Sequence, residues 1–384
     1  MKLFEKIFSI TNNKNKKVIT ILGHKFEYDI PKPVVVVLDP GGIGDYMLTR
    51  PYFKYFKQSP KYKGCKFVFV ARKMYRDMLD CYDWKCFNKV VDYQGRKFLY
   101  DKVYQKEILD KIQANPRIKA VINLRSVGVF GSPDAEARNL LAQKIKAKEK
   151  IITALDLDNQ VDKDPQFKPY TKVFTINSDE HDELENRRIL MEKILEMPIP
   201  KETMSIDPMA AFERSYITIS MLTKPDRAYP EEKWIQVINY LTENTPDDFT
   251  IMFLGSAGER KEIKEFIKKL DNKEKCMNIA GRIPISIVPF LLKNSKLLIS
   301  IESGNVHIAH CVNAKTVCLC NGSHYRRFQP YNDENIKYVY PREFSESLKT
   351  ATPEMLKKYY ISPGFLTADI EVEDVIDAIN SFIK

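Results

Sequence analysis

The sequence lacks the long apolar runs of an integral membrane protein. No uninterrupted apolar stretch reaches the roughly 18 residues that cross a bilayer as a helix. The N-terminal segment, MKLFEKIFSITNNKNKK, also lacks the long apolar core and the cleavage site of a signal peptide. We therefore expect a soluble or peripheral protein. The apolar residues of this segment alternate with lysines at helical spacing, which fits an amphipathic segment on an anionic membrane and also fits a frayed or packed terminus. These residues are Leu3, Phe4, Ile7, Phe8 and Ile10.

Cysteine is scarce and odd in number. The seven cysteines are scattered and lie in apolar runs, which is typical of reduced, buried thiols in a cytoplasmic protein. Cys318 and Cys320 stand two apart on an expected strand, so both point to the same face. Core positions are therefore favoured over metal ligation.

A compact metal site is also lacking. His307 and His310 stand three apart on one face of an expected helix, but no set of carboxylate or cysteine partners completes the ligands. Two D-x-D sequences within residues 156–164 look like the motif of metal-dependent sugar transferases. They lie in a polar stretch between the expected domains, where a solvated linker is favoured. We expect no bound metal.

The chain has ample length and charge. Its 384 residues exceed the size at which one hydrophobic core usually keeps growing, so two domains are expected. Lysine and arginine number 61 against 51 acidic residues, a net charge of +10. This balance favours anionic partners such as nucleotides, phosphorylated glycans, acidic membranes or nucleic acid, without choosing among them.

Short apolar runs alternate with longer amphipathic ones. Several of the short runs are continuously apolar, as in strands buried on both faces of a parallel sheet. A hairpin over 17–30, with Gly23 near its turn, precedes them. The expected strands are 34–39, 66–71, 89–93, 120–124, 216–220, 250–255, 297–302 and 316–320, and the expected helices are 46–58, 101–114, 134–146, 180–196, 230–244, 258–270, 285–293 and 306–312. The alternation appears once before about residue 150 and again after about residue 215. It predicts an α/β protein with two Rossmann-like, doubly wound domains facing a central cleft.

The expected domain boundary lies near residue 200. Residues 156–172 and 197–208 are rich in Pro, Asp and Lys and poor in apolar periodicity. We assign residues 1–200 to an N-terminal domain and 201–384 to a C-terminal one, with a final helix that packs back on the N-terminal domain. Ligands of such sheets bind beyond the carboxyl ends of the strands.

A glycine-rich turn follows the first buried strand. Gly41, Gly42 and Gly44 suggest a nucleotide loop, but the third glycine of G-x-G-x-x-G is absent and the next strand ends in alanine and arginine. The turn does not match a Walker A loop either, since no Lys-Ser or Lys-Thr pair follows it. The turn places Asp45 at the start of a helix. Asp45 is then either a helix cap, which the spacing favours, or a carboxylate that takes a proton from a bound hydroxyl.

Two later turns have the composition of phosphate sites. Small residues at 303–305 follow Glu302 and begin the helix that carries His307, so free backbone N–H groups and the helix dipole attract an anion. Thr223, Lys224 and Arg227 follow an earlier strand and supply a hydroxyl and two cations. An ordinary capped turn and a solvated basic loop are the alternatives at these two places.

These pieces, in this order, resemble glycosyltransferase family 9, the lipopolysaccharide heptosyltransferases. The similarity covers most of residues 33–331, and the last four segments in close succession make it specific. The segments are GIGDYMLTRP, RAYPEEKW, FLGSAGERKEI, NIAGRIPISIVPFLLKNSKLLIS, SIESGNVHIAH and NGSHYRRFQPY.

The resemblance implies a GT-B fold, with the acceptor held by the N-terminal domain and the nucleotide sugar by the C-terminal one. It also implies metal-independent, inverting sugar transfer with no cofactor. Asp45 matches the proposed general base, Glu259 and Ile283 fall where the nucleoside is expected, and Gly42 and Gly44 lie on the acceptor side. The remaining donor-site residues are Thr223, Lys224, Arg227, Glu302, Ser303, Gly304, Asn305 and His307.

The mechanism that follows uses Asp45 to remove the proton of an acceptor hydroxyl as that oxygen attacks the anomeric carbon. The amides at 303–305, with Lys224 and Arg227, stabilise the departing nucleoside diphosphate. Three departures from the family pattern stand out. Glu302 stands where aspartate is usual, Asp39 replaces a basic residue, and Asn305-Val306 replaces a smaller or more apolar pair. These departures leave heptose specificity open.

We expect a glycosyltransferase that uses a nucleotide-diphosphate sugar, with ADP-heptose as one candidate. Its expected acceptor is a lipid-linked or lipopolysaccharide-core glycan, or another cell-surface glycan, at the cytoplasmic face of the inner membrane. Peripheral contact with that anionic membrane is expected, and a nucleic-acid partner is not. Two alternatives remain: a nucleotide-sugar epimerase on the same fold, and a catalytically silent sugar-nucleotide binding protein.

Overall fold

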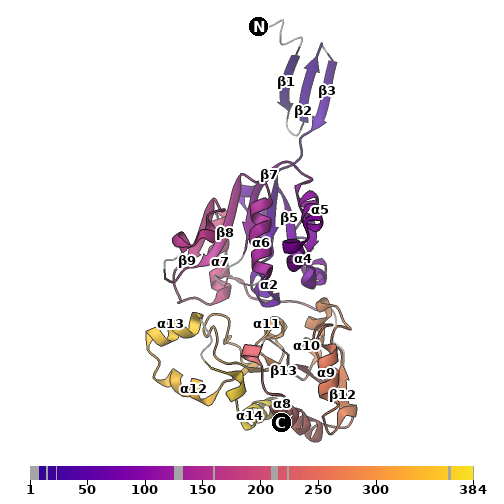
Figure 1. The fold of residues 1–384 in the computed structure, drawn as a ribbon, viewed down its shortest axis with the longest axis vertical. Coiled ribbons are helices and arrows are strands. Elements are labelled where there is room, and N and C mark those ends of the chain that lie inside the picture. The colour runs from indigo at the N-terminus through magenta and orange to yellow at the C-terminus, as the bar shows by residue number, and fades with distance from the viewer. Residues whose placement is uncertain are drawn as a thin grey trace.

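The computed structural model contains three β-sheets (Figure 1). An antiparallel sheet of three strands lies at the N-terminal end, and two parallel sheets of six strands follow, each with helices packed on it. The expected α/β architecture of two Rossmann-like domains is thereby confirmed. The structure describes residues 8–13, 16–22, 24–124, 133–158, 161–208, 215–222, 225–361 and 365–383.

The first parallel sheet has the strand order β6-β5-β4-β7-β8-β9. Its central strand is buried on both faces: Val35 and Val37 belong to one hydrophobic core, and Val34, Val36 and Leu38 to another. This double burial explains why the run of valines is continuous rather than alternating. The strands are β4 (Val34–Leu38), β5 (Lys66–Arg72), β6 (Lys89–Tyr93), β7 (Ile118–Asn123), β8 (Glu149–Leu155) and β9 (Lys172–Ile176), and the helices are α2 (Ile43–Thr49), α3 (Arg76–Met78), α4 (Gly95–Tyr100), α5 (Lys102–Gln113), α6 (Pro133–Lys144) and α7 (Glu183–Leu195).

The first sheet extends further along the chain than expected. β8 and β9 pair in parallel, and the polar residues 156–172 connect them or begin β9. This stretch, with its two D-x-D sequences, therefore lies within the first sheet's part of the chain and is not interdomain. β9 is an edge strand whose first four residues are exposed or half-buried, so it lacks the apolar signature of an inner strand.

The second parallel sheet has the order β12-β11-β10-β13-β14-β15. Three of its inner strands, β10, β13 and β14, are fully buried, as their apolar runs predict, whereas residues of β11 alternate between half-buried and buried. The strands are β10 (Tyr216–Ser220), β11 (Thr250–Phe253), β12 (Cys276–Asn278), β13 (Leu297–Ile301), β14 (Thr316–Leu319) and β15 (Ile336–Val339), and the helices are α8 (Glu231–Asn244), α9 (Arg260–Ile267), α10 (Val288–Asn294), α11 (Gly304–Cys311), α12 (Arg342–Lys349), α13 (Pro353–Ile361) and α14 (Val372–Ile383).

The final helix packs on the second sheet. Val372, Val375 and Ile379 of α14 belong to the same hydrophobic core as strands β10 and β13. The expectation that this helix packs back on the N-terminal domain is therefore wrong. Instead α13 makes such a contact: Tyr360 donates a hydrogen bond of 2.6 Å to the carbonyl of His181, just before α7.

The N-terminal sheet consists of β1 (Phe8–Asn13), β2 (Lys16–Ile21) and β3 (His24–Asp29). β2 and β3 form the expected hairpin, while Gly23 lies outside the described residues. The helical spacing read from the N-terminal segment is wrong for 8–13, where alternating β-branched and polar residues form a strand. The described part of the chain contains no helix of the length and apolar character that crosses a bilayer.

Candidate functional site

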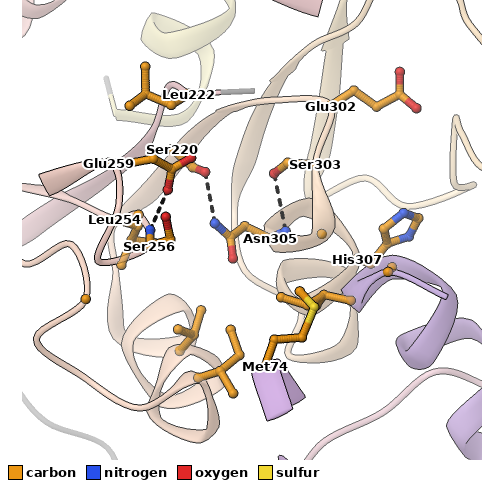
Figure 2. Close-up of a pocket in the computed structure, with 18 of the residues that line it drawn as sticks. Met74, Ser220, Leu222, Leu254, Ser256, Glu259, Glu302, Ser303, Asn305 and His307 are labelled. Atoms are coloured by element: carbon orange, nitrogen blue, oxygen red, sulfur yellow. Dashed lines mark hydrogen bonds between the residues drawn. The ribbon is translucent and has the colours of Figure 1, made fainter. Parts of the chain in front are cut away.

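One pocket of about 720 Å³ lies where the two parallel sheets face each other (Figure 2). Strand ends from both sheets open onto it. Gly42–Asp45 follow β4, Ser220 ends β10, Leu254 follows β11 and Glu302 follows β13. The carboxyl ends of the strands therefore build the pocket, as expected for a doubly wound fold.

The start of α11 forms one wall of this pocket. Ser303 caps the helix, its hydroxyl accepting from the Asn305 N–H at 3.3 Å, and the Asn305 amide donates to the Ser220 hydroxyl at 2.9 Å (Figure 2). These bonds tie the turn after β13 to the end of β10. The helix N-terminus, with Gly304 and Ser303 lining the pocket, presents positive partial charge to a ligand there.

Asp45 lines the same pocket from α2. It is the N3 residue of a capping box, with Oδ2 accepting from the Gly42 N–H at 2.8 Å, whereas Gly42 is the N-cap. Its other oxygen, Oδ1, accepts from Nη2 of Arg187 at 2.9 Å. About 30% of the Asp45 side chain remains exposed. Asp45 therefore has a structural role in the helix start and still reaches the pocket.

A buried ionic chain stands behind Asp45. Arg187 of α7 also pairs with Glu183 at 2.9 Å and donates to the carbonyl of Leu124 at 2.7 Å. Glu183 in turn accepts from Nε of Arg327 at 2.8 Å. Arg187, Glu183 and Arg327 are each at most 3% exposed. Because Arg327 lies between β14 and β15 of the second sheet while α7 and α2 belong to the first sheet's part of the chain, this series of ion pairs joins the two halves at the pocket.

Two glycines bring α2 and α11 into close contact. A β-carbon at Gly44 would lie 2.7 Å from Cδ2 of His307, and one at Gly304 would lie 3.0 Å from Cβ of Ile43. A side chain at Gly44 would force the His307 ring or the helices to shift, and one at Gly304 would require Ile43 to move by a few tenths of an ångström. Gly42 and Gly44 both line the pocket, as the acceptor-side expectation requires, but Gly44 also serves this contact between the halves.

His307 is almost fully buried beside Asp45 and hydrogen-bonds through Nδ1 to the Tyr331 hydroxyl. Burial lowers the pKa of its imidazole to about 4, and the nearby Asp45 carboxylate opposes this only in part. The ring is therefore neutral at physiological pH. His310 points elsewhere, stacking on Tyr331 and bonding to Asp333 at 2.7 Å. Within the described residues, no cluster of three or more His, Cys, Asp or Glu side chains is arranged to hold a metal.

The other predicted donor-site residues that the structure describes also line the pocket. Arg227 donates from Nη1 to the carbonyl of Glu302 at 3.3 Å, and Glu302 is buried. Glu259 accepts from the Ser256 N–H at the start of α9, and Ile283 lies on the same side. Thr223 and Lys224 lie outside the described residues.

Asp39 stabilises the glycine turn through a hydrogen bond to its backbone. Its carboxylate is fully buried, accepts from the Gly41 N–H at 3.1 Å and pairs with Arg138 at 3.1 Å and Arg72 at 3.5 Å. The acidic residue that departs from the family pattern is thus part of a buried ion pair. It fixes the loop that leads to Asp45.

The sequence did not indicate a role for two residues behind the pocket. Arg187 and Arg327 carry no local signal, because their partners are far away along the chain. His324 and Phe328 line the pocket itself, and burial lowers the pKa of His324 to about 4. Only the quoted segment NGSHYRRFQPY, which contains both, pointed to this region.

Comparison with known proteins indicates the enzyme class of this chain. Residues 177–359 match the family model described as glycosyltransferase family 9 (heptosyltransferase). This part of the chain is a glycosyltransferase family 9 domain. The expected family and enzyme class, a glycosyltransferase, are thereby confirmed. The family 9 domain includes Arg187, Arg227 and the start of α11, whereas Asp45 precedes it.

Solved structures share the fold of the whole chain. The glycosyl transferase family 9 from Veillonella parvula is 15% identical, with a TM-score of 0.63, over 92% of this chain and 98% of that one. E. coli ADP-heptose lps heptosyltransferase II is 15% identical, with a TM-score of 0.57, over 90% and 98%. E. coli heptosyltransferase WaaC with ADP-2-deoxy-2-fluoro heptose is 18% identical, with a TM-score of 0.55, over 79% and 92%. No curated protein sequence matches the chain significantly. The fold is therefore GT-B, like that of these glycosyltransferases.

Proposed function

We propose that this glycosyltransferase is inverting and metal-independent, and that it moves heptose or a related sugar from a nucleotide-diphosphate donor to a glycan hydroxyl. The observation that carries the proposal is that Asp45 and the N-terminus of α11 line one pocket from opposite halves of the molecule. A carboxylate base and an anion seat are the two groups that metal-free sugar transfer needs.

In the proposed reaction the acceptor oxygen attacks the anomeric carbon on the face opposite the diphosphate. The new C–O bond forms as the bond to phosphate breaks, and the nucleoside diphosphate leaves with the electron pair. The acceptor proton passes to Asp45. The configuration at the anomeric carbon is inverted, because a single displacement occurs on the face opposite the diphosphate.

The leaving diphosphate takes its stabilisation from fixed groups. Backbone N–H groups at 303–305 and the α11 dipole attract the phosphates, and the Arg227 guanidinium at the pocket wall adds a full positive charge. Lys224 and Thr223 are proposed to join them. Neutral His307 beside Asp45 keeps the site free of a further cation near the base.

The donor is proposed to lie on the second sheet's side of the pocket, held by residues 201–384. Ile279, Ile283, Ile285 and Val288 supply an apolar surface for a nucleoside, with Glu259 nearby. The E. coli WaaC structure holds ADP-2-deoxy-2-fluoro heptose, which supports ADP-heptose as the first donor to test. Glu302 is one methylene longer than the aspartate that is usual in the family. A nucleotide carrying a related sugar is therefore the second donor to test.

The acceptor is proposed to be a lipopolysaccharide-core or other cell-surface glycan, held by residues 1–200 at the cytoplasmic face of the inner membrane. Gly42 and Gly44 line the pocket from the first sheet's part of the chain, where the acceptor is proposed to bind. Two observations favour such a ligand. The E. coli structures are heptosyltransferases, and the net charge of +10 suits a phosphorylated glycan.

The experiment uses the full chain with a panel of nucleotide sugars. A donor that binds the folded protein raises its melting temperature, which selects the candidates. Each selected donor is then incubated with and without an acceptor glycolipid, and nucleoside diphosphate release is measured. Release only with acceptor is the expected result. Epimerisation without acceptor would indicate the epimerase instead, and binding without any turnover would indicate a silent binding protein.

A further inference from the structure

The register of the N-terminal sheet divides its side chains into two faces. Directly paired residues of neighbouring strands lie on the same face. Ile10 pairs with Ile19, which pairs with Phe26, and Phe8 pairs with Ile21. One face therefore carries the apolar residues Phe8, Ile10, Ile19, Ile21, Phe26 and Tyr28, and the other carries mainly polar ones, including Ser9, Thr11, Thr20, Lys25 and Glu27.

The apolar face is open to solvent. Phe8, Ile10, Ile21, Phe26 and Tyr28 are each between 44% and 54% exposed. None of them belongs to a hydrophobic core in the described part of the chain. The sheet projects from the end of the first domain in Figure 1. A contiguous exposed apolar patch of this kind marks an interaction site.

Charge is distributed unequally between the two faces. Among the described residues of the sheet, the apolar face carries one lysine, Lys17, and no carboxylate. The opposite face carries Lys16 and Lys25 together with Glu27 and Asp29, and Glu27 pairs with Lys16 at 2.6 Å. The apolar face therefore has a net positive charge, whereas the charges of the opposite face balance. Apolar side chains that enter the headgroup boundary, with cations beside anionic headgroups, are the pattern of a peripheral membrane contact.

We propose that the apolar face of β1–β3 is a docking surface for an anionic lipid bilayer. The inference concerns a surface far from the pocket and does not depend on the proposed reaction. A bilayer suits this face because lipid binding needs exposed apolar area and positive charge, not a shaped partner.

The area of the face argues against a second copy of the chain. Three strands of six residues span about 14 Å by 20 Å, or about 280 Å². A stable protein–protein interface buries about 800 Å² on each partner. Pairing of two such faces would therefore be too small by itself.

The connection to the first domain places the N-terminal sheet at the end of β4 that is opposite the pocket. Residues 30–33 join β3 to the start of β4, where Arg117 donates to the carbonyl of Pro31 and Asn115 to that of Lys32, both at 2.9 Å. The pocket lies at the other end of β4. Docking through the sheet therefore leaves the mouth of the pocket clear of the lipid surface.

The test is co-sedimentation of the full chain with vesicles of phosphatidylglycerol and phosphatidylethanolamine, and with phosphatidylcholine vesicles for comparison. Wild type should bind the anionic vesicles at least tenfold more tightly, and added salt should weaken that binding. Ile10→Thr/Phe26→Thr should lose at least tenfold in affinity. The matched control, Thr11→Ser/Val18→Thr, alters the polar face of the same sheet and should bind as wild type. Threonine suits strands, so the sheet should persist.

Hydrogen exchange of the β2 amides separates loss of the apolar face from unfolding of the sheet. If the double variant unfolds the sheet, Lys17→Gln tests the proposal instead. This substitution removes only a charge, so it should weaken binding to anionic vesicles and leave binding to phosphatidylcholine vesicles unchanged. Absence of wild-type binding, or equal binding by wild type and a folded apolar-face variant, would overturn the proposal. Dimers in sedimentation velocity without lipid, lost in the same variant, would assign the face to a second copy. Because no turnover is measured, this outcome is independent of the proposed reaction.

Discussion

Arg187 donates a hydrogen bond to Asp45 at 2.9 Å, although 142 positions separate the two residues in the chain. The guanidinium is almost fully buried and also contacts Glu183 and the Leu124 carbonyl. Three fixed contacts leave Arg187 little freedom, and Asp45 shares that restriction. The orientation of the proposed base is therefore determined by α7 as much as by the glycine turn.

Asp45→Ala should reduce the rate of sugar transfer by about 10²–10⁴-fold, because the acceptor proton loses its base. Donor binding should persist, since the diphosphate seat belongs to α11. Transfer rate and donor-induced change in melting temperature are the two measurements. Asp77→Ala is the matched control, because Asp77 lines the same pocket and should tolerate the change. Full activity of the Asp45 variant would remove this residue from the mechanism.

Arg187→Lys should lower kcat by about 10–100-fold with little change in donor affinity. Lysine keeps the charge but lacks the planar fork that contacts Asp45, Glu183 and a carbonyl together. Arg188→Lys is the control on the same helix, because Arg188 pairs with Glu185 and Glu192 away from Asp45. Equal kcat values for the two variants would contradict a positioning role for Arg187.

Gly44→Ala should destabilise the protein by about 1–3 kcal/mol, because its β-carbon would overlap His307. The free energy of unfolding in urea gives the measurement. Adding His307→Ala should recover part of the loss, since it removes the overlapping ring, and the double-mutant cycle should show coupling. Gly258→Ala, with its nearest neighbour at 3.8 Å, is the control. Additive effects of the two substitutions would argue against the contact.

His307 should make stability depend on pH. Its pKa falls from 6.5 to about 4 on folding, so between these values the unfolded state binds the extra proton. The free energy of unfolding should therefore fall by about 1.4 kcal/mol for each pH unit as the pH drops from 6.5 toward 4. Above pH 6.5 the ring is neutral in both states, so His307 causes no such loss. Unfolding of wild type and His307→Asn at several pH values measures the difference.

The sequence predicts most inner strands because they are buried on both faces. Val34–Leu38 and Leu297–Ile301 are continuously apolar, and each forms a fully buried strand. β9, β12 and β15 were missed because they are edge strands with partly exposed side chains, and the inner strand β8, which begins with the half-buried Glu149 and Lys150, was missed too. The N-terminal segment was misread because Phe8 and Ile10 fit two periodicities, and only pairing with β2 selects the strand.

The candidate site divides in the same way. Asp45 and Ser303 could be found because glycines and small residues at strand ends have a local signature. Arg187 could not, because its role exists only through contacts with α2 and with the segment around Arg327. The buried Asp39 likewise became interpretable only with Arg138 beside it. Residues whose roles depend on ionic partners far away in the chain have no local sequence pattern from which those roles could be predicted.

The close contact of α2 with α11 has a consequence for motion. Gly44 meets His307 and Gly304 meets Ile43 beside the proposed base and the proposed phosphate seat. A rotation of the two halves that preserves this contact would use it as a pivot. The rim of the pocket would then open and close around substrates, while Asp45 would keep nearly the same distance from the start of α11.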